Sequence, residues 1–222
     1  MRGHAARREP LDVNESVSTL SAPRLFVFAR HAESTANTAG VINSDPARPI
    51  ALTPRGKAQA RTLGTQVAGL DIDVAIATRF ARTQQTVEIA LAGRRVPVLI
   101  EPGLDEIQAG DCDGVPIDDY WAWMGRHGVS ERFPHGENRG EALRRYAGAL
   151  RRLLVRTEPV TLVILHEFAL RRITEAASGS PPAPDAAVAN ATPYLFGAQA
   201  VARAAAGLEL MARSLEPEES VT

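Results

Sequence analysis

Residues 25–34 of the chain read LFVFARHAES, an apolar run that passes directly into a cation and an imidazole. Short continuous apolar runs of this kind are typical of strands that are buried on both faces of a parallel sheet. Three similar runs follow at 73–78, 96–101 and 160–165, and the last of them is rich in β-branched residues. We therefore expect residues 24–29 to form the first of four buried strands.

Stretches with the apolar spacing of helices separate these runs. Thr53 is a predicted N-cap and Pro54 the first helical residue of a segment over 52–70. Further helices are expected over 81–93, 140–157 and 168–178. Strands that alternate with helices form βαβ units, whose helices cover both faces of the sheet. The predicted fold class is therefore α/β, a three-layer α/β/α sandwich with a mostly parallel central sheet.

The 222 residues are enough for one domain with a substantial core, which we expect over 23–214. Residues 1–22 lack the apolar segment of a signal peptide and are predicted to be a flexible extension. The acidic tail at 215–222 is expected to fray.

The region before this tail is harder to interpret. Residues 180–186 are rich in proline and are predicted to form a loop. Residues 192–199 and 208–215 are expected to form two closing strands around a turn near Gly207.

Composition excludes several classes of function. The formal net charge of −1 provides no general basic field for binding nucleic acid. No apolar run approaches the roughly 18 residues of a membrane span. Cys112 is the single cysteine, so neither an internal disulfide nor a cysteine metal cluster can form. These features favour a cytoplasmic protein without membrane or nucleic-acid partners; a homodimer is compatible with them.

Charged side chains follow each of the four apolar runs, where ligands of parallel sheets bind. They are Arg30 and His31, Arg79 and Arg82, Asp105 and Glu106, and His166. Arginine forms paired hydrogen bonds with phosphate, and histidine can attack phosphorus to give a covalent intermediate. A carboxylic acid with a raised pKa can protonate a leaving oxygen. The set of residue types therefore favours phosphoryl transfer.

These residues also resemble a known family, the histidine phosphatase superfamily, which is also called phosphoglycerate mutase-like. RHAES, with Asn37 after it, resembles the family's Arg-His-Gly-Glu-Ser/Thr signature. Further segments resemble family motifs in the same order: LTPRGKAQA (52–60), TRFARTQQT (78–86), LDEIQAGDCDG (104–114), FPHGEN (133–138) and VILHEFALRRI (163–173).

The resemblance implies a role for individual residues. His31 would be the nucleophile that becomes phosphohistidine, and Glu106 the general acid and later the base that activates water. Asp105, directly before Glu106, is the rival candidate for the acid. The phosphoryl group would be bound by Arg30, Arg82 and His166, with Ser34 and Asn37 as further contacts. The family needs no metal, so we expect neither a metal nor a cofactor.

Three positions depart from the family pattern. Ala32 replaces the usual glycine after the nucleophile, which would cost about 1 kcal/mol if the backbone there requires a positive φ. Leu165 stands before His166, where a small polar residue is common. Glu167 follows His166, where the family usually has glycine. Its carboxylate could interact favourably with a helix N-terminus, or it could repel a bound phosphate.

About 60 residues separate Glu106 from His166. The resemblance implies a longer insertion there in mutases, so the short segment favours hydrolysis, with residues 115–139 as a substrate cap. Its large side chains are expected to line the substrate pocket, or else to pack on the core: Tyr120, Trp121, Trp123 and Met124.

The prediction is a metal-independent phosphomonoesterase that acts on a small phosphorylated substrate through phosphohistidine. Two alternatives stay open. One is a degenerate member that binds phosphorylated ligands or proteins without turnover, and the other is a phosphoglycerate-type mutase.

Overall fold

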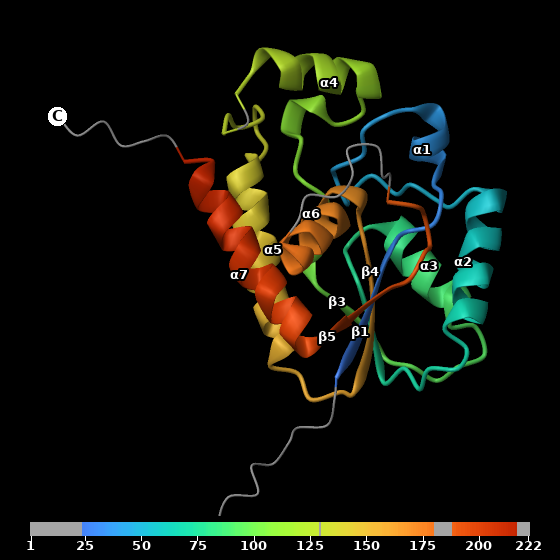
Figure 1. Ribbon diagram of the computed structural model, residues 1–222. Helices are drawn as coiled ribbons and strands as arrows, with labels where there is room; N and C mark the ends of the chain where they lie inside the picture. Colours follow the sequence, from blue (N-terminus) through green and yellow to red (C-terminus); the bar gives the residue numbers. More distant parts are fainter. Residues whose placement is uncertain (1–23, 129, 180–187, 217–222) are drawn as a thin grey trace, which may run out of the picture.

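One sheet of five strands organises the molecule, in the order β3-β2-β4-β1-β5 (Figure 1). The strands are β1 Leu25–Arg30, β2 Val74–Ala77, β3 Val98–Ile100, β4 Val160–Leu165 and β5 Tyr194–Gly197. The first four pair in parallel with their neighbours, and β5 runs antiparallel to β1. The mostly parallel central sheet is confirmed.

The computed structural model describes residues 24–128, 130–179 and 188–216. The predicted extension at 1–22, the loop predicted at 180–186 and the acidic tail beyond residue 216 lie outside these residues.

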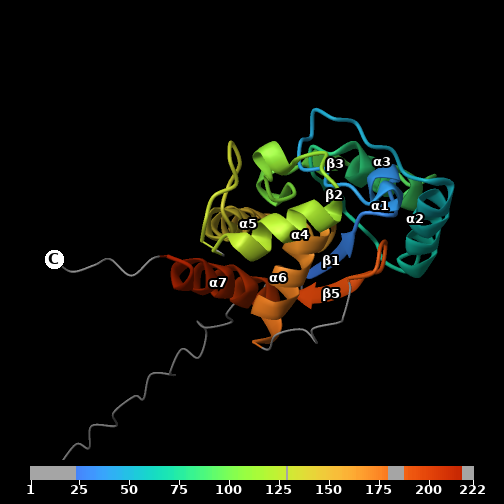
Figure 2. The same cartoon turned by 90° about the horizontal axis from the view of Figure 1, so that it is seen from above.

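Helices cover the sheet on both faces (Figure 1, Figure 2). On one face lie α2 Pro54–Gln66 and α3 Ala81–Ala90; on the other lie α5 Arg139–Leu154, α6 Glu167–Ser178 and α7 Ala198–Ser214. Two shorter helices, α1 Thr35–Ala39 and α4 Ile117–Arg126, lie above the carboxyl ends of the parallel strands. Single 3-10 turns form at Pro102–Leu104 and Gly110–Cys112. The predicted three-layer sandwich is therefore confirmed. Within the ranges described, none of the helices combines the length and apolarity of a membrane span.

Strand side chains alternate between the two helical layers, as a period of two requires. Phe26 and Phe28 of β1 point into the core beneath α5, α6 and α7. Val27 and Ala29 point into the core beneath α2 and α3. All four are at most 1% exposed, which explains why the strand is a continuous apolar run.

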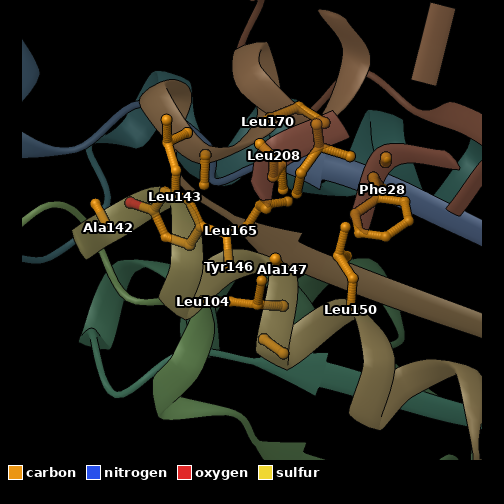
Figure 3. Close-up of a cluster of buried hydrophobic side chains, with 14 of the residues drawn as sticks. Phe28, Leu104, Ala142, Leu143, Tyr146, Ala147, Leu150, Leu165, Leu170 and Leu208 are labelled. Atoms are coloured by element: carbon orange, nitrogen blue, oxygen red, sulfur yellow. The ribbon is translucent and has the colours of Figure 1, made fainter. Parts of the chain in front are cut away.

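The larger core lies beneath α5, α6 and α7 (Figure 3). Phe28 of β1 and Leu165 of β4 meet Leu150 of α5, Leu170 of α6 and Leu208 of α7 there. Complete burial of side chains of this size stabilises the fold by roughly 1.5–3 kcal/mol each. This packing holds β1 and β4 together, and both strands lead into the site.

The expected strand at 208–215 is wrong, because these residues form the second half of α7. Val201, Ala204, Ala205 and Leu208 are buried at helical spacing in an alanine-rich segment. Gly207 makes no turn. A Cβ at Gly207 would lie 2.9 Å from Cβ of Ala176, so the glycine permits close packing of α7 on α6. The other closing strand is present as β5.

Candidate active site

Two histidines stand side by side because their strands are adjacent and in register. Arg30 at the end of β1 pairs with Leu165 at the end of β4, so His31 and His166 leave the sheet together. The backbone N–H of His31 donates to the carbonyl of Leu165 at 2.9 Å. The two imidazole centroids are 5.5 Å apart, and both rings are buried. Sheet topology alone therefore brings these two distant motifs into one site.

The hydrogen bonds of His31 define its tautomer. Nε of Arg82 donates to Nε2 of His31 at 3.0 Å, and a guanidinium cannot accept a hydrogen bond. The proton therefore lies on Nδ1, which donates to the carbonyl of Ala32 at 2.8 Å. Burial lowers the pKa of His31 well below its ordinary value, and the charge of Arg82 lowers it further. The Nε2 lone pair of a neutral imidazole thus faces Arg82, beside the cavity that His31 lines.

Arg82 connects the two histidines. It lies in the first turn of α3, and its Nη2 is 3.0 Å from Nδ1 of His166. Asn43 fixes the other side of the guanidinium through its side-chain and backbone oxygens. Burial lowers the pKa of Arg82 to about 10, which still leaves it protonated at neutral pH. The arrangement fixes a cation between two imidazoles. Arg82 and His31 line a cavity, whereas His166, a predicted phosphate ligand, is fully buried behind Arg82 and does not.

His166 is held by a chain of hydroxyl groups. Because Nδ1 accepts from Arg82, Nε2 carries the proton and donates to Oγ1 of Thr78 at 3.0 Å. Thr78 is 2.9 Å from Oγ1 of Thr83, which donates to the carbonyl of Phe80. Burial lowers the pKa of His166 well below its ordinary value, with Arg82 as the next largest cause. His166 is therefore a neutral, fixed imidazole.

Arg30 provides a second cation at the cavity wall. Its Nη1 donates to the carbonyl of Val188 at 2.9 Å. Among the described residues its buried Nε has no hydrogen-bond partner, an arrangement that an anionic ligand would satisfy. Burial lowers the pKa of Arg30, and the carboxylates of Glu167 and Glu106 oppose this lowering.

Glu106 and Asp105 point in different directions. Asp105 accepts from the backbone and from Nε of Arg79, at 3.0 and 2.6 Å, and does not line the cavity. Glu106 lines the cavity, with Oε2 3.9 Å from Nδ1 of His166. Since His166 is neutral, this contact is not an ion pair. Burial raises the pKa of Glu106, as a general acid requires. The geometry therefore favours Glu106 over Asp105.

Ser34 and Asn37 also line the cavity. Ser34 is the N-cap of α1, and its backbone N–H and hydroxyl donate to Oδ1 of Asn37 at 2.9 and 3.0 Å. This capping box orients the amide of Asn37 and directs its nitrogen away from Ser34.

Other residues of the sequence motifs hold the loop after His31 in place. Oγ1 of Thr53 donates to the Glu33 carboxylate at 2.7 Å, and the backbone N–H of Glu33 donates to Gln59 at 2.8 Å. Oγ1 of Thr53 also accepts from the N–H of Gly56 at 2.9 Å, which confirms the predicted N-cap. A Cβ at Gly56 would lie 2.0 Å from the carbonyl oxygen of Glu33. The LTPRGKAQA segment thus contacts the His31 loop directly.

Ala32 causes no backbone strain. Its φ is not positive, its side chain is fully buried in the core beneath α2 and α3, and its N–H donates to Oγ1 of Thr86 at 3.0 Å. The glycine of the family pattern is therefore not a conformational requirement in this chain.

Two of the four large side chains predicted for the pocket line the cavity. Tyr120 and Trp121 of α4 do so, and Trp121 is 57% exposed. Trp123 stacks on Phe133 at 4.4 Å, and Met124 packs against the core. For Trp123 and Met124 the alternative of core packing is the one observed, because they lie on the inner face of the helix.

Sequence reasoning assigned no role to three residues that support the site. Asn43 fixes Arg82, Thr78 fixes His166, and Arg145 fixes the loop that carries Glu106. Thr78 stands at the end of a predicted strand, which was a usable signal. Asn43 and Arg145 act across long sequence separations that the sequence does not reveal. Among the described residues, no group of three His, Cys, Asp or Glu side chains could hold a metal ion.

Residues 26–195 match the family model of the histidine phosphatase superfamily (branch 1). The chain is 36% identical over 90 residues to an adenosylcobalamin/alpha-ribazole phosphatase of Escherichia coli (strain K12), a match that covers 40% of this chain. That match spans 43% of the relative's length, less than half of it.

Solved structures share the fold over a longer span. The alpha-ribazole phosphatase of Shigella flexneri superposes with a TM-score of 0.63 at 26% identity, covering 71% of this chain and 81% of that one. A phosphoglycerate mutase of Bacillus anthracis superposes with a TM-score of 0.70 at 15% identity, and the match covers 83% of this chain and 97% of that one. Because both a phosphatase and a mutase have this fold, the fold alone does not select between hydrolysis and isomerisation.

Proposed function

The chain belongs to the histidine phosphatase superfamily, and we propose that it hydrolyses phosphate monoesters of small molecules, without a metal or cofactor, through a phosphohistidine at His31. The observation that carries the proposal is the tautomer of His31, with Nδ1–H held by the Ala32 carbonyl and Nε2 unprotonated beside Arg82. The alpha-ribazole phosphatases among its relatives support an ester hydrolase.

The first half-reaction transfers the phosphoryl group to the protein. A bound phosphoryl oxygen takes over the Nε–H of Arg82, which frees the Nε2 lone pair of His31. The lone pair attacks phosphorus while the bond to the leaving oxygen breaks and its electron pair stays on that oxygen. Glu106 supplies the proton that this oxygen needs. Arg82 and Arg30 surround the transferring oxygens, and Ser34 and Asn37 line the same cavity. His166 acts through Arg82, to which its Nδ1 is hydrogen-bonded. Neutral histidines and a protonated glutamic acid are the states that the pKa directions favour.

The second half-reaction returns the phosphoryl group to water. Ionised Glu106 accepts a proton from a water molecule, whose oxygen attacks phosphorus, and the P–N bond breaks to restore the Nε2 lone pair. We prefer hydrolysis over isomerisation because the short cap leaves the Glu106 side chain 18% exposed, so water can reach it. The cap segment 115–139 is proposed to contact the leaving group through Tyr120 and Trp121. The cytoplasm is the proposed location.

A direct assay tests the proposal. Hydrolysis of p-nitrophenyl phosphate is followed over pH 4–8 in excess chelator for wild type, His31→Ala and a matched control, His135→Asn. His135 has an exposed side chain beside Asp111, and asparagine tolerates its positive φ. We expect chelator-resistant activity in wild type and the control, and none in His31→Ala. Label from a radioactive ester should remain on the protein in alkali and leave it in acid.

Two outcomes contradict the proposal. Thermal stabilisation by inorganic phosphate without any turnover identifies a phosphate-binding protein. Exchange of phosphate between positions of a phosphoglycerate, faster than its hydrolysis, identifies a mutase.

A further inference from the structure

Glu167 places a carboxylate in the wall of the cavity, directly after His166. It is the first residue of α6 and lines the cavity together with Arg30 and Phe168. Oε1 accepts hydrogen bonds from Nε and Nη2 of Arg171, at 2.9 and 2.6 Å. The side chain is 33% exposed, so its charge is partly screened. The two bonds to Arg171 fix the position of this charge.

The cavity holds few cations for a substrate with more than one anionic group. Among the described residues that line it, Arg30 and Arg82 are the two cations, and Glu106 and Glu167 are the two acids. His31 and His166 are neutral, because burial and Arg82 lower the pKa of each. A bound phosphoryl group with two negative charges engages both arginines. No lining cation is left for a second anion.

The remaining wall is largely apolar. It is formed by Val41, Ile42, Ile117, Tyr120, Trp121 and Phe168. Arg171 is a further cation beside the cavity, but Glu167 already engages it through two hydrogen bonds. Arg139 and Arg172 lie near Phe168 and line another groove with Leu143 and Met211. Arg172 is also paired with Glu175 at 2.6 Å. A short leaving group therefore meets apolar side chains and one carboxylate.

We infer that Glu167 determines substrate class in the proposed hydrolysis: it favours esters whose leaving group is neutral or cationic and disfavours those that carry a second anionic group. A carboxylate of the substrate would enter a part-buried cavity whose arginines are already engaged, close to the charge of Glu167. A hydroxyl or ammonium group would instead donate a hydrogen bond to Glu167. This inference rests on the proposed function and names the substrate class of that same site.

The test uses a matched pair of substrates. Glycerol 3-phosphate carries a hydroxymethyl group where 3-phosphoglycerate carries a carboxylate. O-phosphoethanolamine is a third ester, and its leaving group carries an ammonium cation. The variant is Glu167→Gln, which removes the charge and keeps an oxygen to accept from Arg171. The control is Glu175→Gln, the same change two turns further along α6 and outside the cavity.

We expect wild type to prefer the neutral and cationic esters by kcat/KM. Glu167→Gln should lower the ratio of glycerol 3-phosphate to 3-phosphoglycerate by about five- to tenfold, the scale of one partly screened charge interaction. Glu175→Gln should leave the ratio as in wild type. An unchanged ratio in Glu167→Gln, or a wild-type preference for 3-phosphoglycerate, overturns the inference while the hydrolase itself stands.

A binding measurement separates this failure from failure of the proposed function. If no ester is hydrolysed, including p-nitrophenyl phosphate, the proposed function is wrong. The shift in Tm produced by each ester then measures the same selectivity. Equal shifts for glycerol 3-phosphate and 3-phosphoglycerate in wild type and Glu167→Gln would also overturn the role of Glu167.

Discussion

Arg145 of α5 donates a hydrogen bond from Nη2 to the backbone carbonyl of Glu106 at 3.3 Å. Its Nη1 donates to the carbonyls of Gly103 and Asp105 at 3.2 and 3.0 Å, and its guanidinium pairs with Glu137. Glu137 in turn accepts from the N–H of Gln108 at 3.0 Å. This pair fixes the loop on both sides of Glu106, so Arg145 is a positioning residue for the proposed acid.

Arg145→Met should therefore impair proton donation by Glu106 beyond its effect on stability. We expect the free energy of unfolding to fall by about 3–5 kcal/mol, because Glu137 is left buried and unpaired. At a temperature where the variant is folded, kcat/KM for an alkyl phosphate should fall about 100-fold. The loss for p-nitrophenyl phosphate should be much smaller, since that leaving group needs no proton. Equal losses for both esters would indicate a purely structural role, and Arg145→Lys should recover part of the activity.

Glu106→Gln tests the acid itself. For an alkyl ester such as glycerol 3-phosphate, kcat/KM should fall by about 10²–10⁴ because the leaving oxygen is no longer protonated. For p-nitrophenyl phosphate the loss should be roughly tenfold or less on the same Brønsted reasoning. The kcat/KM of wild type on the alkyl ester should also decline as pH rises through the raised pKa of Glu106. Asp105→Asn, by contrast, should act through the contact with Arg79 and leave this pH profile unchanged.

Stability should decrease as pH falls below about 6.5, the ordinary pKa of histidine. The pKa of His31 and of His166 is lowered by burial, so the unfolded chain takes up protons that the native state excludes. As pH falls from 6.5 to the lowered pKa, each histidine should reduce the free energy of unfolding by about 1.4 kcal/mol per pH unit. The raised pKa of Glu106 acts in the opposite sense, because its protonated form is favoured in the native state.

His166→Gln should reduce the slope of Tm against pH, because it removes one of the two histidines that take up a proton only in the unfolded chain. His135→Asn changes an exposed histidine and should leave the slope as in wild type. A wild-type Tm that stays constant from pH 7 to pH 5 would contradict the assignment of both histidines as neutral.

Sequence reasoning found the site because the carboxyl ends of parallel strands converge. Register pairs Arg30 with Leu165, so His31 and His166 had to lie side by side, and this follows from alternation of strands and helices. The same reasoning could not find Asn43, whose contact with Arg82 spans 39 residues and depends on the path of a loop. Nor could it orient Trp123 and Met124, because a short amphipathic helix can turn either edge of its apolar face to the core.

Ala32→Gly tests whether the departure from the family pattern weakens catalysis. Because φ is not positive at Ala32 and its Cβ is buried, glycine relieves no strain. We expect kcat/KM to be unchanged. The free energy of unfolding should fall by about 1 kcal/mol, because glycine gives the unfolded chain more conformational freedom. Denaturant unfolding and the p-nitrophenyl phosphate assay measure the two effects. A clear gain in kcat/KM would show that Ala32 does restrict His31, the proposed nucleophile.

Gly207, where the sequence predicts a turn, is instead the point at which α7 packs on α6, and its substitution tests this packing. Alanine would gain up to about 1 kcal/mol of helix propensity, but its Cβ would lie 2.9 Å from Cβ of Ala176 and 3.2 Å from its carbonyl oxygen. Forcing α6 and α7 apart costs about 1–3 kcal/mol, so we expect Gly207→Ala to be destabilising and Gly207→Val more so. Gly148→Ala on α5 is the control: its nearest neighbour would be a flexible arginine nitrogen at 3.6 Å, so it should stabilise by about 0.5–1 kcal/mol. If both alanine variants gain stability equally, Gly207 is not required for the contact between α6 and α7.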